Sequence, residues 1–195
     1  MSDKDNLGDA WQITPSEYLK TRPPISRIGE PTSQYLTMPD GVRLAIDVYL
    51  PESTVDHQEK HFPTILILTP YYRRFKVTAL GAEPSPNIAI YRDFFVPRGY
   101  ALVVVDVRGS GASFGARDCF RSPREREDYR EIANWVVAQP WSSGTIGSTG
   151  ISYLGAASCF LASTGIPLLK RLHLFFRFMI RTRITFSPGV SSAPP

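Results

Sequence analysis

The sequence predicts an α/β fold built on a mostly parallel β-sheet. Residues 62–70 (FPTILILTP) and 100–109 (YALVVVDVRG) are continuous apolar runs of strand length, which is typical of strands buried on both faces of a parallel sheet. Residues 122–138 have helical periodicity and follow the second of these runs. Strands that alternate with helices indicate a parallel sheet covered by crossover helices.

The chain begins with a polar stretch and a predicted hairpin. Residues 1–30 contain prolines and lack periodicity, so we expect an arm on the surface. Residues 33–51 (SQYLTMPDGVRLAIDVYLP) form two alternating runs divided by Pro39-Asp40-Gly41, a pattern typical of an antiparallel β-hairpin. A polar loop at residues 53–61 then leads to the first buried strand.

The helix at residues 122–138 has clear signals at both ends. Ser122 can cap it, Pro123 suits the first helical position, and Glu125 can complete a capping box. Gln139-Pro140 ends it. One face is apolar and predicts burial against the sheet: Tyr129, Ile132, Ala133, Val136 and Val137.

Ser152 stands at the junction of a small-residue strand, residues 144–152 (GTIGSTGIS), and a helix predicted from Tyr153 onward. A serine at such a turn is the position of the nucleophile in α/β-hydrolases, with the hydroxyl exposed above the sheet. The pattern is G-x-S-Y-x-G, with Gly150 two places before the serine and Gly155 three after. The alternative is a small residue that merely fits a tight turn.

Composition excludes several classes of protein. Hydrophobic residues make up 43% and charged residues 21%, as in soluble globular domains. Five of the 22 basic residues lie in residues 166–195, which hold no acid, so the other 17 nearly balance the 18 acidic residues. A neutral body offers no basic face for nucleic acid, and we expect no metal or organic cofactor.

The chain start and the cysteines bear on location. The first residues are polar and acidic, unlike a secretory signal, so we expect a cytoplasmic protein. Cys119 and Cys159 have no C-x-x-C spacing and are expected to be buried free thiols.

A glycine-rich loop follows the second buried strand and raises a rival function. Gly109-Ser-Gly111-Ala-Ser-Phe-Gly115 suggests nucleotide binding, but its last glycine comes one place late for G-x-G-x-x-G. The residues after it do not open a helix, as a pyrophosphate site requires.

Three stretches taken together resemble the X-Pro dipeptidyl-peptidase and cocaine-esterase-like hydrolases (the CocE/NonD group). They are TPYYRRF after the first buried strand, D-x-R-G-x-G-x-S-x-G from Asp106, and P-W-x-x-G followed by G-x-S-Y-x-G. The resemblance covers roughly residues 30–165. It implies the N-terminal part of an α/β-hydrolase fold, a truncated form without the later strands, the cap and the β-rich C-terminal domain.

The resemblance also implies roles for individual residues. Ser152 matches the nucleophile of a serine hydrolase that transfers acyl groups from esters or amides, including X-Pro peptide bonds. The oxyanion hole combines the amide of the next residue, Tyr153, with a tyrosine hydroxyl that matches Tyr71, Tyr72 being the alternative. Two aromatic residues packed under a loop are the structural alternative. Asp106 and Arg108 are interpreted as loop scaffolding.

The catalytic acid and base are missing from the expected part of the sequence. The fold places them after the nucleophile, first Asp or Glu and then His, but no Asp or Glu follows Ser152. His173 comes too soon after Ser152, and His57 and His61 precede the core strands in a polar loop. We therefore expect this chain to be an inactive fragment, with a non-catalytic remnant that binds a partner protein or a membrane surface as the alternative.

Residues 166–195 differ abruptly in composition, being basic and aromatic, and we place the end of the hydrolase region at Gly165. Translated intron or out-of-frame sequence is one interpretation of this tail. A basic amphipathic helix is the other, but charges interrupt it too often for a transmembrane span. Without further strands, residues 145–150 would leave an open sheet edge that could support self-association.

Overall fold

The computed structural model describes residues 14–52, 61–75, 86–119, 122–165 and 174–176. Helices are α1 (Pro15–Lys20), α2 (Pro86–Phe95), α3 (Pro123–Val137) and α4 (Tyr153–Ala162), with a 3₁₀ turn at Val96–Arg98. Strands are β1 (Thr32–Thr37), β2 (Arg43–Tyr49), β3 (Phe62–Thr69), β4 (Ala101–Asp106), β5 (Ser142–Gly150) and β6 (Leu174–Phe176).

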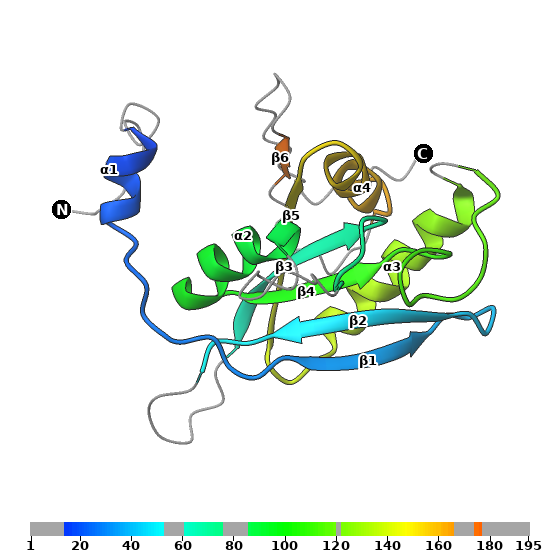
Figure 1. The fold of residues 1–195 in the computed structure, drawn as a ribbon, viewed down its shortest axis with the longest axis horizontal. Helices are drawn as coiled ribbons and strands as arrows, with labels where there is room; N and C mark the ends of the chain where they lie inside the picture. Colours follow the sequence, from blue (N-terminus) through cyan, green and yellow to red (C-terminus); the bar gives the residue numbers. More distant parts are fainter. Residues whose placement is uncertain (1–13, 53–60, 76–85, 120–121, 166–173, 177–195) are drawn as a thin grey trace, which may run out of the picture.

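The strands form one mixed sheet in the order β1-β2-β4-β3-β5-β6 (Figure 1). The first two strands form an antiparallel hairpin, and β2 is antiparallel to β4. The remaining pairs are parallel. The predicted α/β class, the hairpin and the mostly parallel core are therefore confirmed.

Two apolar layers bury the sheet because its central strands are hydrophobic on both faces. On one face, Leu66 and Leu68 of β3 pack with side chains of α3 and α4. On the other, Ile65 and Ile67 pack with Ile88 of α2. α2 thus lies on the face opposite to α3 and α4, which gives three layers.

The two helices that the sequence predicts, α3 and α4, begin at the expected residues, whereas α1 and α2 were not predicted. Ser122 has an extended backbone, and its side chain accepts a hydrogen bond from the amide of Glu125 at 3.2 Å, so the N-cap of α3 is confirmed. α4 begins at Tyr153, directly after Ser152. The position of Ser152 at a strand-to-helix junction is therefore confirmed.

The connections after β3 and β5 diverge to opposite faces of the sheet, which predicts a crevice at the carboxyl ends of these strands. The chain leaves β3 toward α2 on one face, whereas it leaves the neighbouring β5 toward α4 on the other. Ligand sites of open α/β sheets lie at the carboxyl ends of strands where successive connections diverge in this way. A functional site is therefore expected among the residues that follow β3 and β5.

Arg108 ties the hairpin, the loop after β4 and α3 together. Its guanidinium donates to both carboxylate oxygens of Asp128 at 2.8 and 2.6 Å, and to Asp40 in the hairpin turn at 2.7 Å. The side chains of Arg108 and Asp128 are each only 4% exposed. The bidentate geometry offsets the cost of removing these charges from water.

The structure differs from the sequence-based expectations and alternatives at three points. Cys119 and Cys159 are free but exposed rather than buried. β6 pairs with residues 148–150 of β5, so that part of the edge is not open. Leu174–Phe176 form the strand β6 and are not part of a continuous amphipathic helix. The other residues of the 166–195 tail lie outside the described residues. Within the described ranges, no helix has the length and hydrophobicity needed to cross a bilayer.

Replacing Arg108 with alanine is predicted to lower the free energy of unfolding by about 3–5 kcal/mol, because it leaves the buried Asp128 carboxylate unpaired. Urea denaturation of the variant and the parent chain measures this difference. The matched control is Arg124→Ala: Arg124 is 62% exposed and lies 3.9 Å from Asp118, so its loss is expected to cost less than about 1 kcal/mol. Equal effects of the two substitutions would contradict the assignment.

Candidate functional site

Ser152 lies in a strained turn between β5 and α4. Its φ of 60° and ψ of −120° are unusual for a residue with a side chain. Ser152 and Tyr72 are the two non-glycine residues with positive φ in the described part of the chain. Both follow the carboxyl ends of neighbouring parallel strands, and Ser152 is exposed. The strain therefore gathers at the crevice that the sheet topology predicts.

Gly150 makes this turn sterically possible. A Cβ at position 150 would overlap the Cβ of Leu154 and lie 3.0 Å from its carbonyl carbon. Leu154 occupies the place of the second glycine in plain G-x-S-x-G. At this contact, therefore, only Gly150 lacks a side chain, and its missing Cβ lets the backbone at position 150 approach Leu154. The side chain of Leu154 is buried in the layer shared with α2. Leucine in place of glycine at position 154 thus adds a side chain to the core, while Gly150 keeps the turn sharp.

The structure brings Tyr71 and Ser152 together. The Tyr71 hydroxyl lies 3.5 Å from Ser152 Oγ, although the two residues are far apart in sequence. The Tyr71 ring also meets the Tyr153 ring edge-on, with centroids 6.4 Å apart. Tyr71 is 48% exposed, so solvent reaches its side chain. No contact between Tyr72 and Ser152 is described; the Tyr72 side chain is exposed.

Several hydrogen bonds fix the loop that carries Tyr71. The Tyr71 amide donates to Thr69 Oγ1 at 2.9 Å, and the Arg73 amide donates to the Asp106 carboxylate at 2.6 Å. The side-chain amide of Asn87 donates to the carbonyls of Tyr71 and Tyr72 at 3.2 and 3.4 Å. The loop is therefore held by side chains from β3, β4 and α2.

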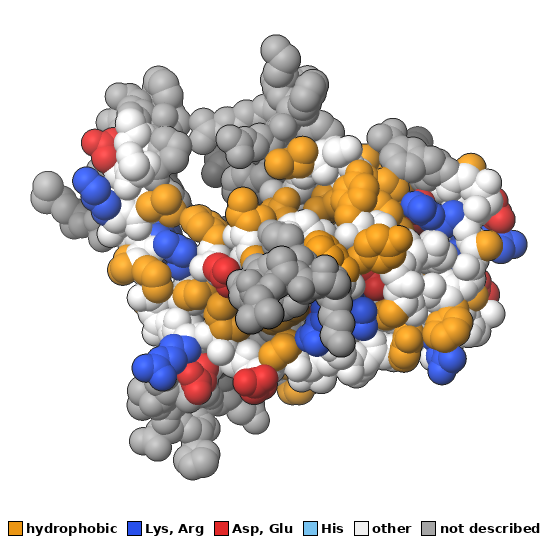
Figure 2. Space-filling view, viewed as in Figure 1, with side chains coloured by type: hydrophobic (Ala, Val, Ile, Leu, Met, Phe, Trp, Pro, Cys, Tyr) orange, Lys and Arg blue, Asp and Glu red, His pale blue; other side chains and the backbone are white. Residues whose placement is uncertain are grey.

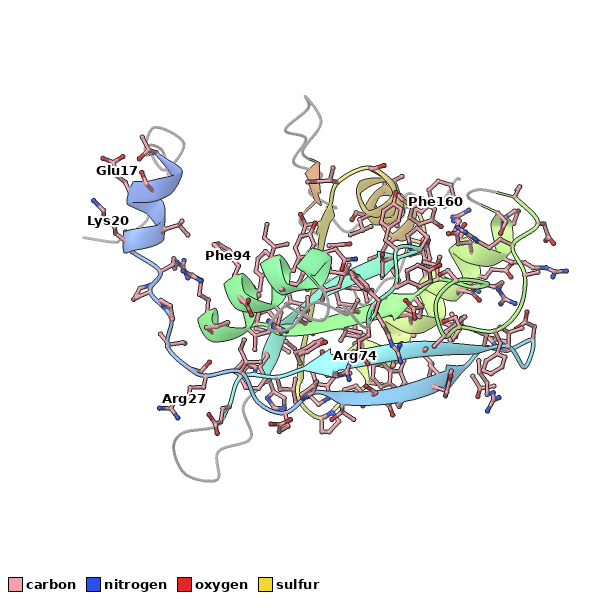
Figure 3. All side chains as sticks on the ribbon, viewed as in Figure 1. Glu17, Lys20, Arg27, Arg74, Phe94 and Phe160 are labelled. Carbon is pink, nitrogen blue, oxygen red and sulfur yellow. The ribbon has the colours of Figure 1, made fainter. Side chains whose placement is uncertain are left out.

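Buried carboxylates anchor the arginines that follow the tyrosines. Asp47 of β2 is fully buried and accepts from Arg74 Nε at 2.8 Å, with Arg73 Nε 3.3 Å away. Figure 3 shows Arg74 lying over β2. Asp106 accepts a second amide, that of Ala112, at 3.0 Å. Burial raises the pKa of Asp106, while the two amides act in the opposite direction.

Tyr153 is anchored beneath the nucleophile, unlike the exposed Tyr71. Its hydroxyl lies 3.4 Å from the Tyr129 hydroxyl and accepts from Arg117 at 3.3 Å. Tyr129 in turn donates to the buried Glu125 carboxylate at 2.6 Å. Burial, together with the charge of Glu125, raises the pKa of Tyr129, which therefore remains a neutral donor. These contacts fix the first turn of α4, where the Tyr153 amide lies at the positive end of the helix.

The described histidine is not at the site. His61 is exposed and directly precedes β3. Ser152 lies beyond the carboxyl ends of β3 and β5, so the length of β3, roughly 25 Å, separates His61 from Ser152. His57 and His173 lie outside the described residues. Within the described ranges, no three His, Cys, Asp or Glu side chains converge as a metal site would require.

The glycine-rich loop after β4 is packed against an acid. A Cβ at Gly111 would collide with the Asp106 carboxylate, so the space that a phosphate would need holds a buried carboxylate. α3 begins only at Pro123, well after the loop. The geometry of the loop therefore does not support the nucleotide-binding alternative.

Two hollows flank the loops, but Ser152 lines neither. One of about 340 Å³ lies between α3 and the end of α4 and includes Phe160, labelled in Figure 3. Another of about 470 Å³ lies along the loop after β4 and includes Arg117. Figure 2 shows hydrophobic side chains gathered over α2 and α4.

The sequence interpretation missed Asn87, Asp47 and Arg117. Asp47 occupies an alternating strand, and its two arginine partners follow a different strand, so no local pattern marks it. Asn87 near the start of a helix is indistinguishable from an ordinary capping residue in sequence. Asp106 and Arg108 hold loops together, in agreement with their interpretation as scaffolding.

Comparison with known proteins gives a consistent family. The sequence profile described as X-Pro dipeptidyl-peptidase (S15 family) matches residues 40–180, so the similarity extends past Gly165. A Mycobacterium bovis protein whose name describes it as a serine esterase is 40% identical over 193 residues, covering 94% of this chain and 30% of that protein. The cocaine esterase of a Rhodococcus species is 33% identical over 135 residues, covering 69% of this chain and 21% of that enzyme.

Solved structures agree in fold. A CocE/NonD family hydrolase from Staphylococcus aureus superposes with a TM-score of 0.58 at 31% identity, covering 73% of this chain and 26% of that one. An α-amino acid ester hydrolase gives a TM-score of 0.57 at 27% identity, covering 73% and 24%. The chain thus spans about a third or less of the length of these relatives. With the family profile matched over most of its length, the chain belongs to the X-Pro dipeptidyl-peptidase (S15) family of α/β-hydrolases.

Proposed function

We propose that this chain carries the nucleophile and the oxyanion hole of a serine hydrolase that acts on ester or amide bonds. Ser152 Oγ attacks the substrate carbonyl and forms an acyl-enzyme, with the leaving alcohol or amine taking up a proton. Where a general base is present, water then releases the acid and regenerates Ser152. The single observation that carries the proposal is the strained Ser152, with positive φ, beside the Tyr71 hydroxyl at 3.5 Å.

The oxyanion would be stabilised from two sides. The Tyr71 hydroxyl comes from the loop after β3, and the Tyr153 amide comes from the first residue of α4. Donors that are already in place stabilise the negative oxygen of a tetrahedral intermediate without reorganisation. The hydroxyl-to-Oγ distance of 3.5 Å is long for a hydrogen bond, and such contacts often tighten once substrate is bound.

Within the part of the chain that the structure describes, no histidine lies beside Ser152 to act as the general base. No Asp or Glu follows Ser152 in the sequence, and the described His61 lies at the opposite edge of the sheet. We therefore propose that the 195-residue chain has nucleophile geometry without turnover. A serine without a base reacts slowly, but a preformed oxyanion hole still supports a residual reaction.

The substrate class follows from the relatives. Their names describe a cocaine esterase, an α-amino acid ester hydrolase and Xaa-Pro dipeptidyl-peptidases. All three reactions break a bond to a carbonyl carbon, so an activated ester or an amide is the proposed substrate class.

Imidazole is predicted to rescue the reaction of Ser152 with a fluorophosphonate probe. Without added base, labelling of the chain should be only slightly above that of Ser152→Ala. With imidazole in solution, labelling should rise at least about 10-fold, because imidazole takes the Oγ proton while the oxyanion hole holds the phosphoryl oxygen. Mass spectrometry of the peptide that contains Ser152 locates the adduct.

Two outcomes would change the conclusion. Labelling of Ser152 without imidazole at a rate close to that with imidazole would show that this chain contains a base, and would overturn the proposal that it lacks one. No labelling of Ser152 at any imidazole concentration, with the chain folded by circular dichroism, would rule out the nucleophile. Ser148→Ala is not a suitable control, because Ser148 is buried and bonded to Leu66 and Ser158. The exposed Ser143 offers a better one as Ser143→Ala.

Tyr71→Phe is predicted to slow the imidazole-dependent labelling about 10- to 100-fold, because it removes one oxyanion donor. Tyr72→Phe distinguishes the two adjacent tyrosines and should have little effect, since the Tyr72 hydroxyl has no described contact with Ser152. Tyr35→Phe on β1 controls for the loss of a phenol elsewhere. If Tyr72→Phe slowed labelling more than Tyr71→Phe, the oxyanion donor would be Tyr72 and not Tyr71.

The outer edge of β5 supports a second candidate, self-association of the chain. Among the described strands, β6 pairs only with residues 148–150, so residues 142–147 have no described partner on that side. Unpaired backbone groups at a sheet edge can bind another strand. We therefore propose that copies of the chain pair through this edge.

Sedimentation of the chain is predicted to depend on its concentration, with a dimer forming at high concentration. Thr145→Lys places a charge on the edge strand, which opposes strand pairing between copies, and should shift the equilibrium toward monomer. A parent chain that stays monomeric across the concentration range would contradict the proposal.

A further inference from the structure

We propose that Asn87 is the positioning residue of the oxyanion hole. Its side-chain amide holds the backbone of Tyr71 and Tyr72 in the conformation that places the Tyr71 hydroxyl beside Ser152. This inference rests on the proposed function, which it extends from the reacting groups to a residue on α2. Asn87 touches neither Ser152 nor the Tyr71 hydroxyl in any described contact, so it acts through the loop.

The contacts of Asn87 point to this role. One nitrogen, Nδ2, donates to two consecutive carbonyls, those of Tyr71 at 3.2 Å and Tyr72 at 3.4 Å. Two neighbouring carbonyls that face the same donor require a sharp bend of the chain between them. Tyr72 supplies that bend with a φ of 66°.

The bend is costly for Tyr72 and needs support. Side chains with a Cβ rarely adopt positive φ, and a bulky residue adopts it only when its surroundings hold it there. The Tyr72 side chain is 53% exposed, so packing of the ring does not account for the strain. The carbonyls of Tyr71 and Tyr72 lie on either side of the bend, and the hydrogen bonds that the structure describes for them come from Asn87.

The remaining anchors of the loop act at other points. Thr69 accepts from the Tyr71 amide, and Asp106 accepts from the Arg73 amide. These bonds fix the two ends of the segment, whereas Asn87 fixes the two carbonyls between them. Without Asn87, Tyr72 can relax to negative φ while both ends stay in place, and the Tyr71 side chain then turns away from Ser152.

Asn87 itself is placed for this task. It is the second residue of α2, and its Oδ1 is buried without a described hydrogen-bond partner. A buried acceptor without a partner is unfavourable. The orientation of the Asn87 side chain is therefore set by its NH₂ group, which donates to two backbone carbonyls at once.

A double-mutant cycle with Tyr71 tests the proposal, with imidazole-dependent labelling of Ser152 by a fluorophosphonate as the readout. Asn87→Ala and the isosteric Asn87→Asp, which removes the donor, should each slow labelling at least about 10-fold, as expected for a displaced catalytic group. In the Tyr71→Phe background the same substitutions should change the rate less than about 2-fold, because the hydroxyl that Asn87 positions is absent. Equal losses in both backgrounds, or no loss in either, would overturn the proposal.

Glycine at position 72 provides the rescue. Because glycine adopts positive φ without strain, Asn87→Ala combined with Tyr72→Gly should recover most of the lost rate. A purely structural role of Asn87 in α2 would not be rescued by a change in the loop, so failure of the rescue overturns the proposal. Asp93→Asn, an exposed change on the same helix, is the matched control and should leave the rate unchanged.

A second readout separates this proposal from the proposed function. If the parent chain shows no labelling of Ser152 with imidazole, the proposed function fails, but Asn87 can still be assessed. Fluorotyrosine placed at position 71 of the full chain gives a ¹⁹F resonance that reports the surroundings of the ring. Asn87→Ala should shift it, and the added Tyr72→Gly should restore it. An unchanged resonance in a folded variant would overturn the positioning role.

Discussion

The site depends on the divergence of two connections at the centre of the sheet. β3 and β5 are parallel neighbours, yet α2 after β3 and α4 after β5 cover opposite faces. Their carboxyl ends therefore stay open to solvent between the two layers. Tyr71 and Ser152 are each within three residues of a strand end, so the sheet brings them together without any long connecting structure.

Buried charge does two different tasks next to this crevice. Asp106 faces the loops and accepts two backbone amides, which orders the segment that carries Tyr71. Arg108, two residues later, faces the opposite layer and joins α3 to the hairpin through Asp128 and Asp40. One short segment after β4 thus couples the site to the remainder of the fold. The cost of burying these groups is offset because each carboxylate or guanidinium has several partners.

The sequence predicted the features that depend on local patterns. Apolar runs located β3 and β4, the Pro39-Asp40-Gly41 turn located the hairpin, and Ser122 located the start of α3. It also placed Ser152 at a strand-to-helix junction. Contacts between distant segments have no such pattern: the partners of Asp47 and the loop held by Asn87 became visible only in three dimensions. The exposure of both cysteines was missed because cysteine is often buried, whereas here the residues lie on a loop and on the outer side of α4.

Nucleophile geometry and proton transfer are separable in this fold. Gly150 packs closely against Leu154, which makes the strained turn at Ser152 possible. Residues at the ends of β3, β4 and α2 hold the loop that places Tyr71. None of these groups transfers a proton to or from the nucleophile in the proposed reaction. The elbow and the oxyanion hole can therefore form from packing and backbone hydrogen bonds alone, and the base has only to reach the exposed Ser152. An exposed Ser152 at the rim of the sheet is the arrangement that would accept such a base.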